Sequence, residues 1–479
     1  MNRTCYAVYV LLCIFSIIPL TAKGYNVEEN ARILKEISEL DIPVLEIITV
    51  NGEEPTFKTV NHPGDNNGKS ITDMTRVPGR LTITKKGQLL YDSGDYVEDQ
   101  SGMKFRVRGN ASPWDMYPRP FKIKLEKKAD LLLRGDEKKY KDKNWLLLRE
   151  IKLRCMIGFK VNELVNLQWT PAYEYVNFVM NGEYIGLYML CESVRRNTDC
   201  RLDVDETGYV FEYDQYWWNE DLSVESNIAD EPLNYTFKYP KPEEITNEQL
   251  SYFKNMIGKF EQSVKDGTYP QYMDLESFAE WILGHDILGS WDGTGSNFFL
   301  TKYDNTDSSK VMMGNMWDLD NSFYMTDDWD NAHYHFVFKS LLDPNNDSKD
   351  LLNAYINKWD ELSPTIFEDI NTFLEDFNES DYATDLTKAF AIHQVYYDEQ
   401  VRSVEQYIIE AQYWFKGRKP WMTNAMDQLR AEVSGIHSIS SGSGEKQIFS
   451  LDGRRLQQLE RGINIVRYSD GTSKKVFVK

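Results

Sequence analysis

Few cysteines occur in this sequence, which limits how its fold can be cross-linked. Five are present among 479 residues: Cys5, Cys13, Cys155, Cys191 and Cys200. The first two fall in an apolar N-terminal stretch, and the remaining three are an odd number that cannot form a disulfide framework. A Cys191–Cys200 pair is permitted, although three buried thiols satisfy the sequence equally well. A chain that is 41% hydrophobic can bury a sizeable core instead.

Basic residues are also outnumbered. The chain has 54 Lys and Arg against 75 Asp and Glu, a formal net charge of -21. A surface of this sign repels phosphate backbones and anionic membranes. Nucleic acid is therefore not expected as a partner.

Several short catalytic motifs are absent. The sequence contains no Gly-x-Ser-x-Gly elbow, no His-Glu-x-x-His pair and no Walker phosphate loop. These absences argue against the hydrolases, zinc peptidases and P-loop nucleotidases that depend on such motifs.

The longest apolar run lies at the N-terminus. Residues 1–24 hold one arginine, Arg3, an apolar run over 6–20, and the small residues Ala22 and Gly24. This run is too short to span a bilayer comfortably and is typical of a secretory signal cleaved after Gly24. We expect an exported protein that is periplasmic, displayed on the cell surface or secreted, with no transmembrane segment once the signal is removed.

The first half of the mature chain has the pattern of a β-rich structure. Residues 40–240 contain short apolar runs separated by turn residues, which predicts antiparallel strands and hairpins. Asn181-Gly182 predicts a tight hairpin turn. The segment 153–167 spaces its apolar residues at helical intervals, and we expect an amphipathic helix there that lies on the sheet.

Helical periodicity dominates residues 241–432. It is interrupted by a predicted hairpin whose arms are 297–305 and 310–320. The sequence therefore predicts an α+β fold, with a sheet-rich N-terminal lobe, a mainly helical C-terminal lobe and a cleft between them.

The C-terminus has a different composition. Residues 433–446 are rich in Gly and Ser and predict a flexible linker. Residues 447–479 predict three short strands with turns at three X-Gly dipeptides, and are too short for an independent core. This tail is similar to the short β modules on many exported bacterial proteins, which are associated with sorting or surface display. The alternative is a small accessory β unit.

Four oxygen-bearing residues have a spacing that suits phosphoryl transfer. Asp292 and Asn297 lie five residues apart in "SWDGTGSNFFL", and Asp318 and Asp320 follow in "MWDLDNSFY" on the return arm of the predicted hairpin. Protein kinases place a catalytic aspartate and a metal-binding asparagine at this spacing, followed by a metal-binding aspartate. We therefore expect Asp292 to be catalytic and the other three to bind a metal ion.

Two plainer interpretations remain open for these residues. Asp and Asn favour turns because their side chains bond the nearby backbone. A calcium loop is also conceivable, but "DLDNSF" lacks the glycine at the sixth position and the distal glutamate of an EF-hand.

The N-terminal half supplies candidate ligands for the phosphates. Lys122 and Lys124 alternate with apolar residues and leave the same face of a predicted strand. Either one is a candidate, and two solvated lysines would give the same pattern. Arg108 lies at a strand end, where turn amides and an arginine can cradle phosphate. Glu163, on the predicted helix, is either a partner for the lysine or a surface glutamate.

These stretches together resemble the CotH kinase family, the spore coat protein H group. The motifs that carry the resemblance are RVRGNASPWDMYPRPFKIKLEKKADLL, KNWLLLRE, VNFVMNGEYIGLYMLCESV, SWDGTGSNFFL and MWDLDNSFY, in the family's order and approximate spacing. The resemblance implies an atypical protein-kinase-like fold for residues 25–432, which binds ATP with Mg²⁺ or Mn²⁺ and phosphorylates proteins, often exported ones.

The resemblance also implies roles for individual residues. Asp292 matches the catalytic aspartate, Asn297 the asparagine downstream of it, and Asp318 the metal-binding aspartate, with Asp320 as a second. Glu192 matches a family glutamate to which we assign no role. Neither Lys122 nor Lys124 is singled out.

The chain departs from the family pattern at two places. Arg149-Glu150-Ile151-Lys152 stands where the family commonly has Asn and then Asp, and "NASPWD" replaces the more usual Asn-Ser-Thr/Ser-Trp. The first departure raises the question of how the following helix begins. Neither removes a proposed catalytic group.

Three functions are compatible with the sequence. The leading one is an exported, Mg²⁺- or Mn²⁺-dependent kinase that transfers the γ-phosphoryl group of ATP to Ser or Thr of exported proteins. The second is an inactive kinase-like surface scaffold that binds glycans or matrix proteins, suggested by 12 Trp and 29 Tyr, including those in 216–221. The third is a glycoside hydrolase that uses Asp292 and Asp318 as its carboxylates.

Overall fold

The computed structural model describes most of the chain. The described residues are 26–60, 70–110, 118–135, 138–150, 152–228, 233–290, 292–293, 296–323, 338–434, 446–468 and 473–478. The predicted signal peptide and most of the predicted linker lie outside these ranges, so both remain predictions.

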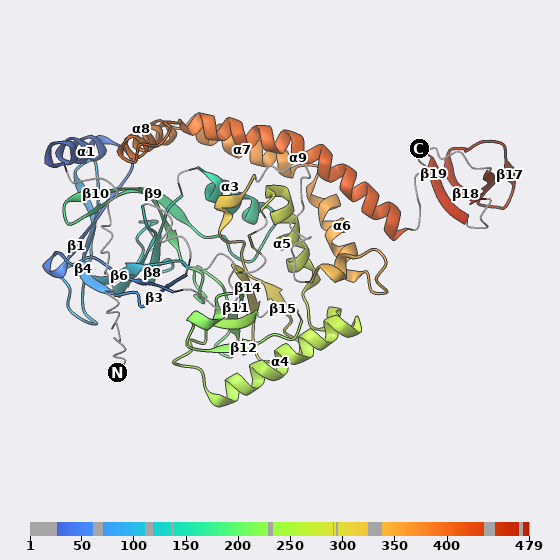
Figure 1. Ribbon diagram of the computed structural model, residues 1–479, viewed down its shortest axis with the longest axis horizontal. Coiled ribbons are helices and arrows are strands. Elements are labelled where there is room, and N and C mark those ends of the chain that lie inside the picture. Colours follow the sequence, from blue (N-terminus) through green and yellow to red (C-terminus); the bar gives the residue numbers. More distant parts are fainter. Residues whose placement is uncertain are drawn as a thin grey trace, which may run out of the picture.

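A β-barrel forms the N-terminal part of the molecule (Figure 1). Its strands are β1 (Val44–Thr49), β4 (Val77–Lys85), β6 (Met103–Val107), β7 (Phe121–Ala129), β8 (Asp142–Leu148), β9 (Tyr173–Met180) and β10 (Glu183–Glu192). They pair in the order β1-β9-β10-β8-β7-β6-β4, and β4 also pairs with β1, which closes the ring. Only the β1–β9 pair in this ring is parallel. Closure removes the free edges that an open sheet would leave.

The barrel interior is filled by the alternating apolar side chains that the sequence predicts. On β7, Phe121, Ile123 and Leu125 are buried in this core, while Lys122 and Lys124 leave the opposite face. β5 (Gln88–Asp92) extends the sheet from β4, and β2 (Lys58–Val60) pairs with β3 (Ser70–Thr72) separately.

The β9–β10 connection confirms the predicted hairpin. Asn181 and Gly182 both have positive φ, 52° and 79°, as a two-residue type I′ turn requires. The helix α1 (Val27–Glu39) packs beside this turn, because Asn30 donates to the Gly182 carbonyl and accepts from the Tyr184 amide.

A second sheet joins the two halves of the chain. It is built from β11 (Tyr209–Asp214), β12 (Ser223–Glu225), β13 (Asn234–Tyr239), β14 (Phe298–Lys302) and β15 (Val311–Met313). Their order is β12-β13-β11-β14-β15, and all pairs are antiparallel. The predicted hairpin is therefore confirmed as β14–β15. Because β11 pairs with β14, strands from both sides of residue 240 share this sheet.

The C-terminal half is mainly helical, as predicted. The helices are α4 (Asn247–Asp266), α5 (Leu275–Leu288), α6 (Asp350–Leu362), α7 (Ile366–Asn378), α8 (Asp381–Tyr396) and α9 (Val404–Val433). Capping boxes begin α4 at Thr246 and α9 at Ser403, and left-handed glycines, Gly267 and Gly289, end α4 and α5. In Figure 1, α9 runs along the helical half, and α4 lies beneath the second sheet.

The helix predicted over 153–167 exists as α3 (Arg154–Leu164), and it lies against the barrel as expected, with the rings of Phe159 and Tyr173 of β9 5.8 Å apart. It is not amphipathic, because both its barrel-facing and helix-facing residues are buried, and it contacts α5, α7 and the 3₁₀ turn η4 (Leu319–Asn321). Gly158 allows the closest approach, since a Cβ there would lie 2.4 Å from Leu319 Cδ1. The helix thus lies between the barrel and the helical half, against the turn that carries Asp320.

The C-terminal module has one strand more than predicted. Its strands are β16 (Lys446–Ser450), β17 (Arg455–Leu456), β18 (Gly462–Tyr468) and β19 (Ser473–Val478), in the order β17-β16-β18-β19. β17 was missed because two residues are too few to show alternation. Leu456, Val466 and Val476 form its small buried cluster.

Two further expectations concern cysteines and membranes. Cys155, Cys191 and Cys200 are all free thiols, so the permitted pair is not formed. Within the described residues, none of the helices is both long and apolar enough to cross a bilayer.

Candidate active site

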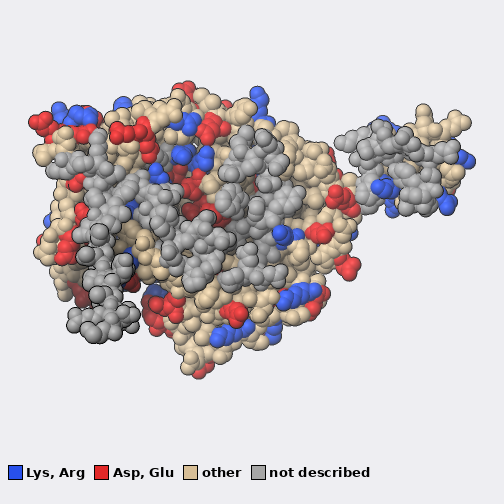
Figure 2. Space-filling model, viewed as in Figure 1, with Lys and Arg blue, Asp and Glu red and all other residues tan. Residues whose placement is uncertain are grey.

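A niche between the barrel and η4 brings the predicted groups together. Its barrel side includes Arg108 and Glu150, and its other side includes Asp318 and Asp320. The open volume is about 50 Å³, room for a cation or a few water molecules but not for a whole nucleotide. Figure 2 shows acidic and basic side chains meeting in a hollow on this face of the molecule.

Asp292 lies just beyond the end of α5. It forms a side-chain hydrogen bond with Asn321, whose Oδ1 accepts from Ser290 Oγ at 2.9 Å. Burial, followed by the charge of Asp318, raises the pKa of Asp292 to about 7. The carboxyl of Asp292 therefore titrates near neutral pH and lies close to a second carboxylate, that of Asp318.

Asn297 is fixed at both its backbone and its side chain. Its amide N–H donates to Glu212 Oε1 at 2.9 Å, and its Nδ2 donates to Asp318 Oδ2 at 3.1 Å. Its φ is 66°, in the left-handed region that asparagine tolerates better than most residues. This backbone conformation aims the side chain of Asn297 at Asp318.

Asp318 and Asp320 flank the first residue of η4. Asp318 also has a positive φ, 58°. Partial removal from water, then the charges of Asp318, Glu150 and Asp292, raises the pKa of Asp320 to about 7. Asp292, Asn297, Asp318 and Asp320 therefore lie within electrostatic reach of one another, although they come from two separate loops.

The donor set fits a hard divalent cation. Carboxylate and amide oxygens are the ligands that Mg²⁺ prefers, and Mg²⁺ usually takes one or two carboxylates together with waters and substrate phosphates. Among the described residues, no cluster of three His, Cys, Asp or Glu side chains has the arrangement of a complete metal site. Asp318 and Asp320 with the amide of Asn297 would thus hold the ion only in part. The pKa values of Asp292 and Asp320 are raised first by burial and second by neighbouring carboxylates, whose negative charge a cation would neutralise.

A cluster of cations lies beside the niche. Lys122 pairs across the strands with Arg106, and burial, then the charges of Arg106, Lys238, Arg195 and Arg108, lowers the pKa of Lys122 to about 7. Within the described part of the chain, Lys122 forms no ion pair with a carboxylate. Uncompensated positive charge of this kind is what a phosphate ligand would stabilise.

The structure does not bring two of the predicted residues to this cluster. Lys124 is exposed, further along β7, opposite Lys104 and Asn144. Glu163 lies on the exposed side of α3 and pairs with Lys160 at 3.1 Å, so its proposed pairing with a strand lysine is wrong. The buried position of α3 turns this glutamate away from the barrel strands.

Sequence reasoning missed two acids that position Asn297. Glu212 accepts from the Asn297 amide and pairs with Lys238 Nζ at 2.8 Å. Asp214, two residues along β11 on the same face, accepts from Ser296 Oγ at 3.3 Å. Two acids alternating in the otherwise apolar strand "YVFEYD" were the available signal.

Glu150, in the segment 149–152 that departs from the family pattern, explains how α3 begins. Its Oε1 accepts from the amides of Lys152 and Arg154, both at 3.0 Å, and thereby caps the first turn of α3. Its Oε2 accepts from Tyr175 Oη at 2.8 Å. Glu150 thus starts the helix and lines the niche.

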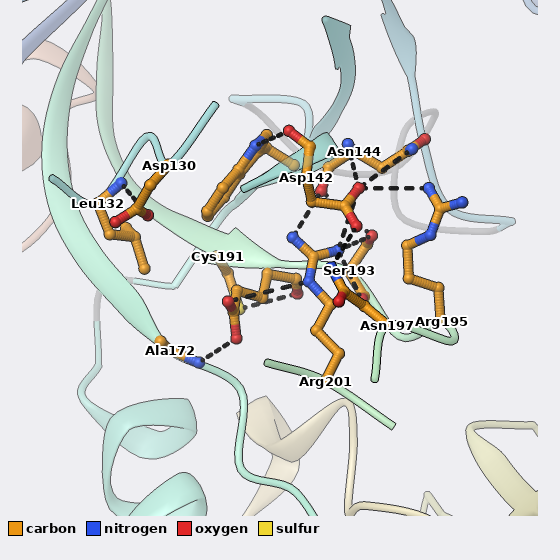
Figure 3. A network of polar contacts seen from close by, with 12 residues as sticks. Asp130, Leu132, Asp142, Asn144, Ala172, Cys191, Ser193, Arg195, Asn197 and Arg201 are labelled. Atoms are coloured by element: carbon orange, nitrogen blue, oxygen red, sulfur yellow. Dashed lines mark hydrogen bonds and ion pairs between the residues drawn. The ribbon is translucent and has the colours of Figure 1, made fainter. Parts of the chain in front are cut away.

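Glu192, the last residue of β10, belongs to a buried ionic network, part of which is drawn in Figure 3. Its Oε1 pairs with Arg134 at 3.0 Å and approaches Arg201 at 3.9 Å, while Oε2 accepts from the Ala172 amide. Figure 3 also shows Asp142 between Arg195 and Arg201, at 3.4 and 3.7 Å. These contacts tie β10 to neighbouring loops, which is a structural role.

Fold and site define an α+β protein in which a β-barrel and a helical half border a niche lined by carboxylates and arginines. A family model described as CotH kinase protein matches residues 106–408. The chain belongs to the CotH kinase family, and this membership suggests a kinase-like function. No curated protein matches the chain.

Proposed function

We propose that this protein is an exported atypical kinase that transfers the γ-phosphoryl group of ATP to Ser or Thr hydroxyls of exported proteins, with Mg²⁺ or Mn²⁺ as cofactor. The observation that supports it is the proximity of Asp292, Asn297 and Asp318, beside a barrel face on which Lys122 lies among other cations.

Asp292 is the proposed general base. A carboxylate whose pKa lies near 7 can accept a hydroxyl proton at neutral pH. Its bond to Asn321 fixes its orientation, and Asn321 is itself held by Ser290. Asp292 would therefore orient the acceptor hydroxyl and take its proton.

Asn297, Asp318 and Asp320 are the proposed holders of the cation. A bound divalent ion would neutralise charge on the transferred phosphoryl group. Glu212 supports this arrangement by fixing the Asn297 backbone.

Lys122 and Arg108 are the proposed phosphate ligands. Both belong to the cation cluster, and Arg108 also lines the niche. Lys124 is not included, because it lies further along β7 and is exposed.

Export is proposed from the signal-like residues 1–24. Because ATP is scarce outside cells, phosphorylation would take place before or during export. The substrate would then be another protein on the same route.

The test is transfer of radiolabel from γ-labelled ATP to casein or to the protein itself, with Mn²⁺ or Mg²⁺ present. We expect labelling by the wild type that is lost in Asp292→Ala and Asp318→Ala. Asp427→Ala, at an exposed site on α9, is the matched control. Equal labelling by all four proteins would overturn the assignment. No labelling by a folded wild type would instead support the inactive scaffold.

A further inference from the structure

A second cavity lies away from the niche. It has a volume of about 330 Å³ and is bounded by α4, the 3₁₀ turn η3 (Tyr269–Gln271) and the β14–β15 hairpin. None of its lining residues also lines the niche. Figure 1 shows α4 beside the second sheet, whose strands β14 and β15 contribute Lys302 and Val311 to the lining.

Aromatic rings form two of its walls. Tyr252, on α4, and Tyr272, just after η3, are both half-buried and line the cavity. The ring of Tyr252 stacks on Tyr209, with centroids 5.9 Å apart and planes inclined by 13°. The orientation of this wall is therefore set by the protein core, and Met256 and Phe260 provide buried apolar surface beneath it.

Amide side chains stand at the opening. Asn255, on α4, and Gln271, on η3, are exposed and line the cavity from two different elements. Within the described residues, neither side-chain amide forms a hydrogen bond to the protein. Each therefore presents a donor and an acceptor to a ligand.

The hairpin loop that completes the cavity is held in place internally. Lys302 is 3% exposed and donates from Nζ to the carbonyl oxygens of Thr306 and Ser309, at 2.8 and 2.5 Å. Asp304 accepts from the Thr306 amide at 2.9 Å. The loop is thus preorganised, which lowers the entropic cost of binding.

The charges around the cavity are mixed. Lys259 and Lys302 line it together with Asp307, and Asp304 lies close enough to influence Lys302. Neither sign dominates, so a strongly charged ligand is not favoured. An extended peptide is also disfavoured, because the edge of β15 at Val311 is already bridged by Met273.

We propose that this cavity binds a neutral hexopyranose unit of a glycan. Tyr252 and Tyr272 would contact the apolar face of the sugar ring, and Asn255 and Gln271 would bond its hydroxyls. Aromatic walls with a few polar groups at the opening are the usual composition of a small-molecule site. The site is separate from the proposed phosphoryl-transfer centre and does not depend on it.

The test is saturation-transfer NMR on the full chain with four neutral trisaccharides at millimolar concentration: maltotriose, cellotriose, mannotriose and N,N′,N″-triacetylchitotriose. We expect at least one to bind, and the same sugar to bind at least fivefold more weakly to Asn255→Ala and Gln271→Ala. Lys254→Ala is the control, because Lys254 is exposed on α4 and does not line the cavity.

Two results would overturn the proposal. One is that none of the four sugars binds to the wild type. The other is that a sugar binds with unchanged affinity to both amide variants, which would place its site elsewhere. Circular dichroism of each variant verifies that the fold is retained, and ATP-dependent labelling should be unaffected.

Discussion

Asn297 Nδ2 donates to Asp318 Oδ2 at 3.1 Å across 21 residues of sequence, and both residues have left-handed backbones. A positive φ in a residue other than glycine costs conformational free energy, and residues with this strain are often found at functional sites. If the two loops were independent turns, their two strained residues would have no reason to contact each other directly. The relationship supports a shared functional role for the two loops.

Asp292→Asn should separate activity from stability. The substitution removes a carboxylate whose pKa is raised by burial and by Asp318, while it keeps the shape of the side chain. We expect the rate of phosphate incorporation to fall by ~100-fold or more, with a melting temperature equal to or above that of the wild type. Asp427→Asn should change neither quantity. A large loss of stability without loss of activity would show that Asp292 is structural.

Gly293→Ala should displace the loop that carries Asp292. A Cβ at this position would lie 2.6 Å from His285 Cε1, and His285 is fully buried beside Trp281. The loop must therefore shift, and we expect activity to fall by about tenfold or more. Gly258→Ala, in α4, is the matched control, because nothing lies within 4 Å of its added Cβ. Full activity in Gly293→Ala would mean that the position of this loop is not critical.

Glu192→Ala should destabilise the barrel. Arg134 and Arg201 both approach the carboxylate of Glu192, and the substitution removes this shared partner. Arg201 is fully buried, so water cannot replace the lost carboxylate. We expect the free energy of unfolding, measured in urea, to fall by about 3 kcal/mol. Glu163→Ala should change it by less than about 0.5 kcal/mol, because Glu163 is exposed. Equal effects of the two substitutions would contradict the structural role assigned to Glu192.

Glu280 should make stability depend on pH. Burial, opposed by the nearby ammonium of Lys358, raises its pKa from 4.5 to about 7 in the folded protein. Between pH 4.5 and about pH 7, Glu280 keeps its proton in the folded protein and loses it in the unfolded chain. The free energy of unfolding therefore falls as pH rises through this range. The loss should be on the order of 1–3 kcal/mol.

Melting curves from pH 4 to pH 8 measure this effect. We expect Glu280→Gln to lose less stability than the wild type across the window, since glutamine does not titrate. Glu276→Gln removes a different and mostly exposed partner of Lys358, and should follow the wild type. Parallel curves for the wild type and Glu280→Gln would contradict the raised pKa.

Local features of the fold were predictable from the sequence. The Asn181-Gly182 turn and the β14–β15 hairpin were predicted because turn residues and alternation act over a few residues. Closure of the barrel was not, because the β1–β4 and β1–β9 pairs join distant segments and leave no local pattern. For the same reason the sequence did not show that α3 also packs against α5, α7 and η4.

The candidate site was predictable where its residues are close in sequence. Asp292, Asn297 and Asp318 lie on one helix-to-hairpin segment, so their spacing was informative. Glu212 and Asp214 were missed because only the pairing of β11 with β14 brings them to Asn297 and Ser296. Glu163 was wrongly included because its contact with a barrel lysine depended on the orientation of a helix.

Calorimetric titration with ATP in the presence of Mn²⁺ tests the central claim most directly, because it measures binding without requiring a protein substrate. We predict saturable heat with the wild type that requires both ATP and the cation, and affinity at least tenfold weaker in Asp318→Ala. Absence of heat with the wild type, or the same affinity in Asp318→Ala, would contradict the claim that a metal ion in this niche, together with the cations beside it, binds the phosphates of ATP.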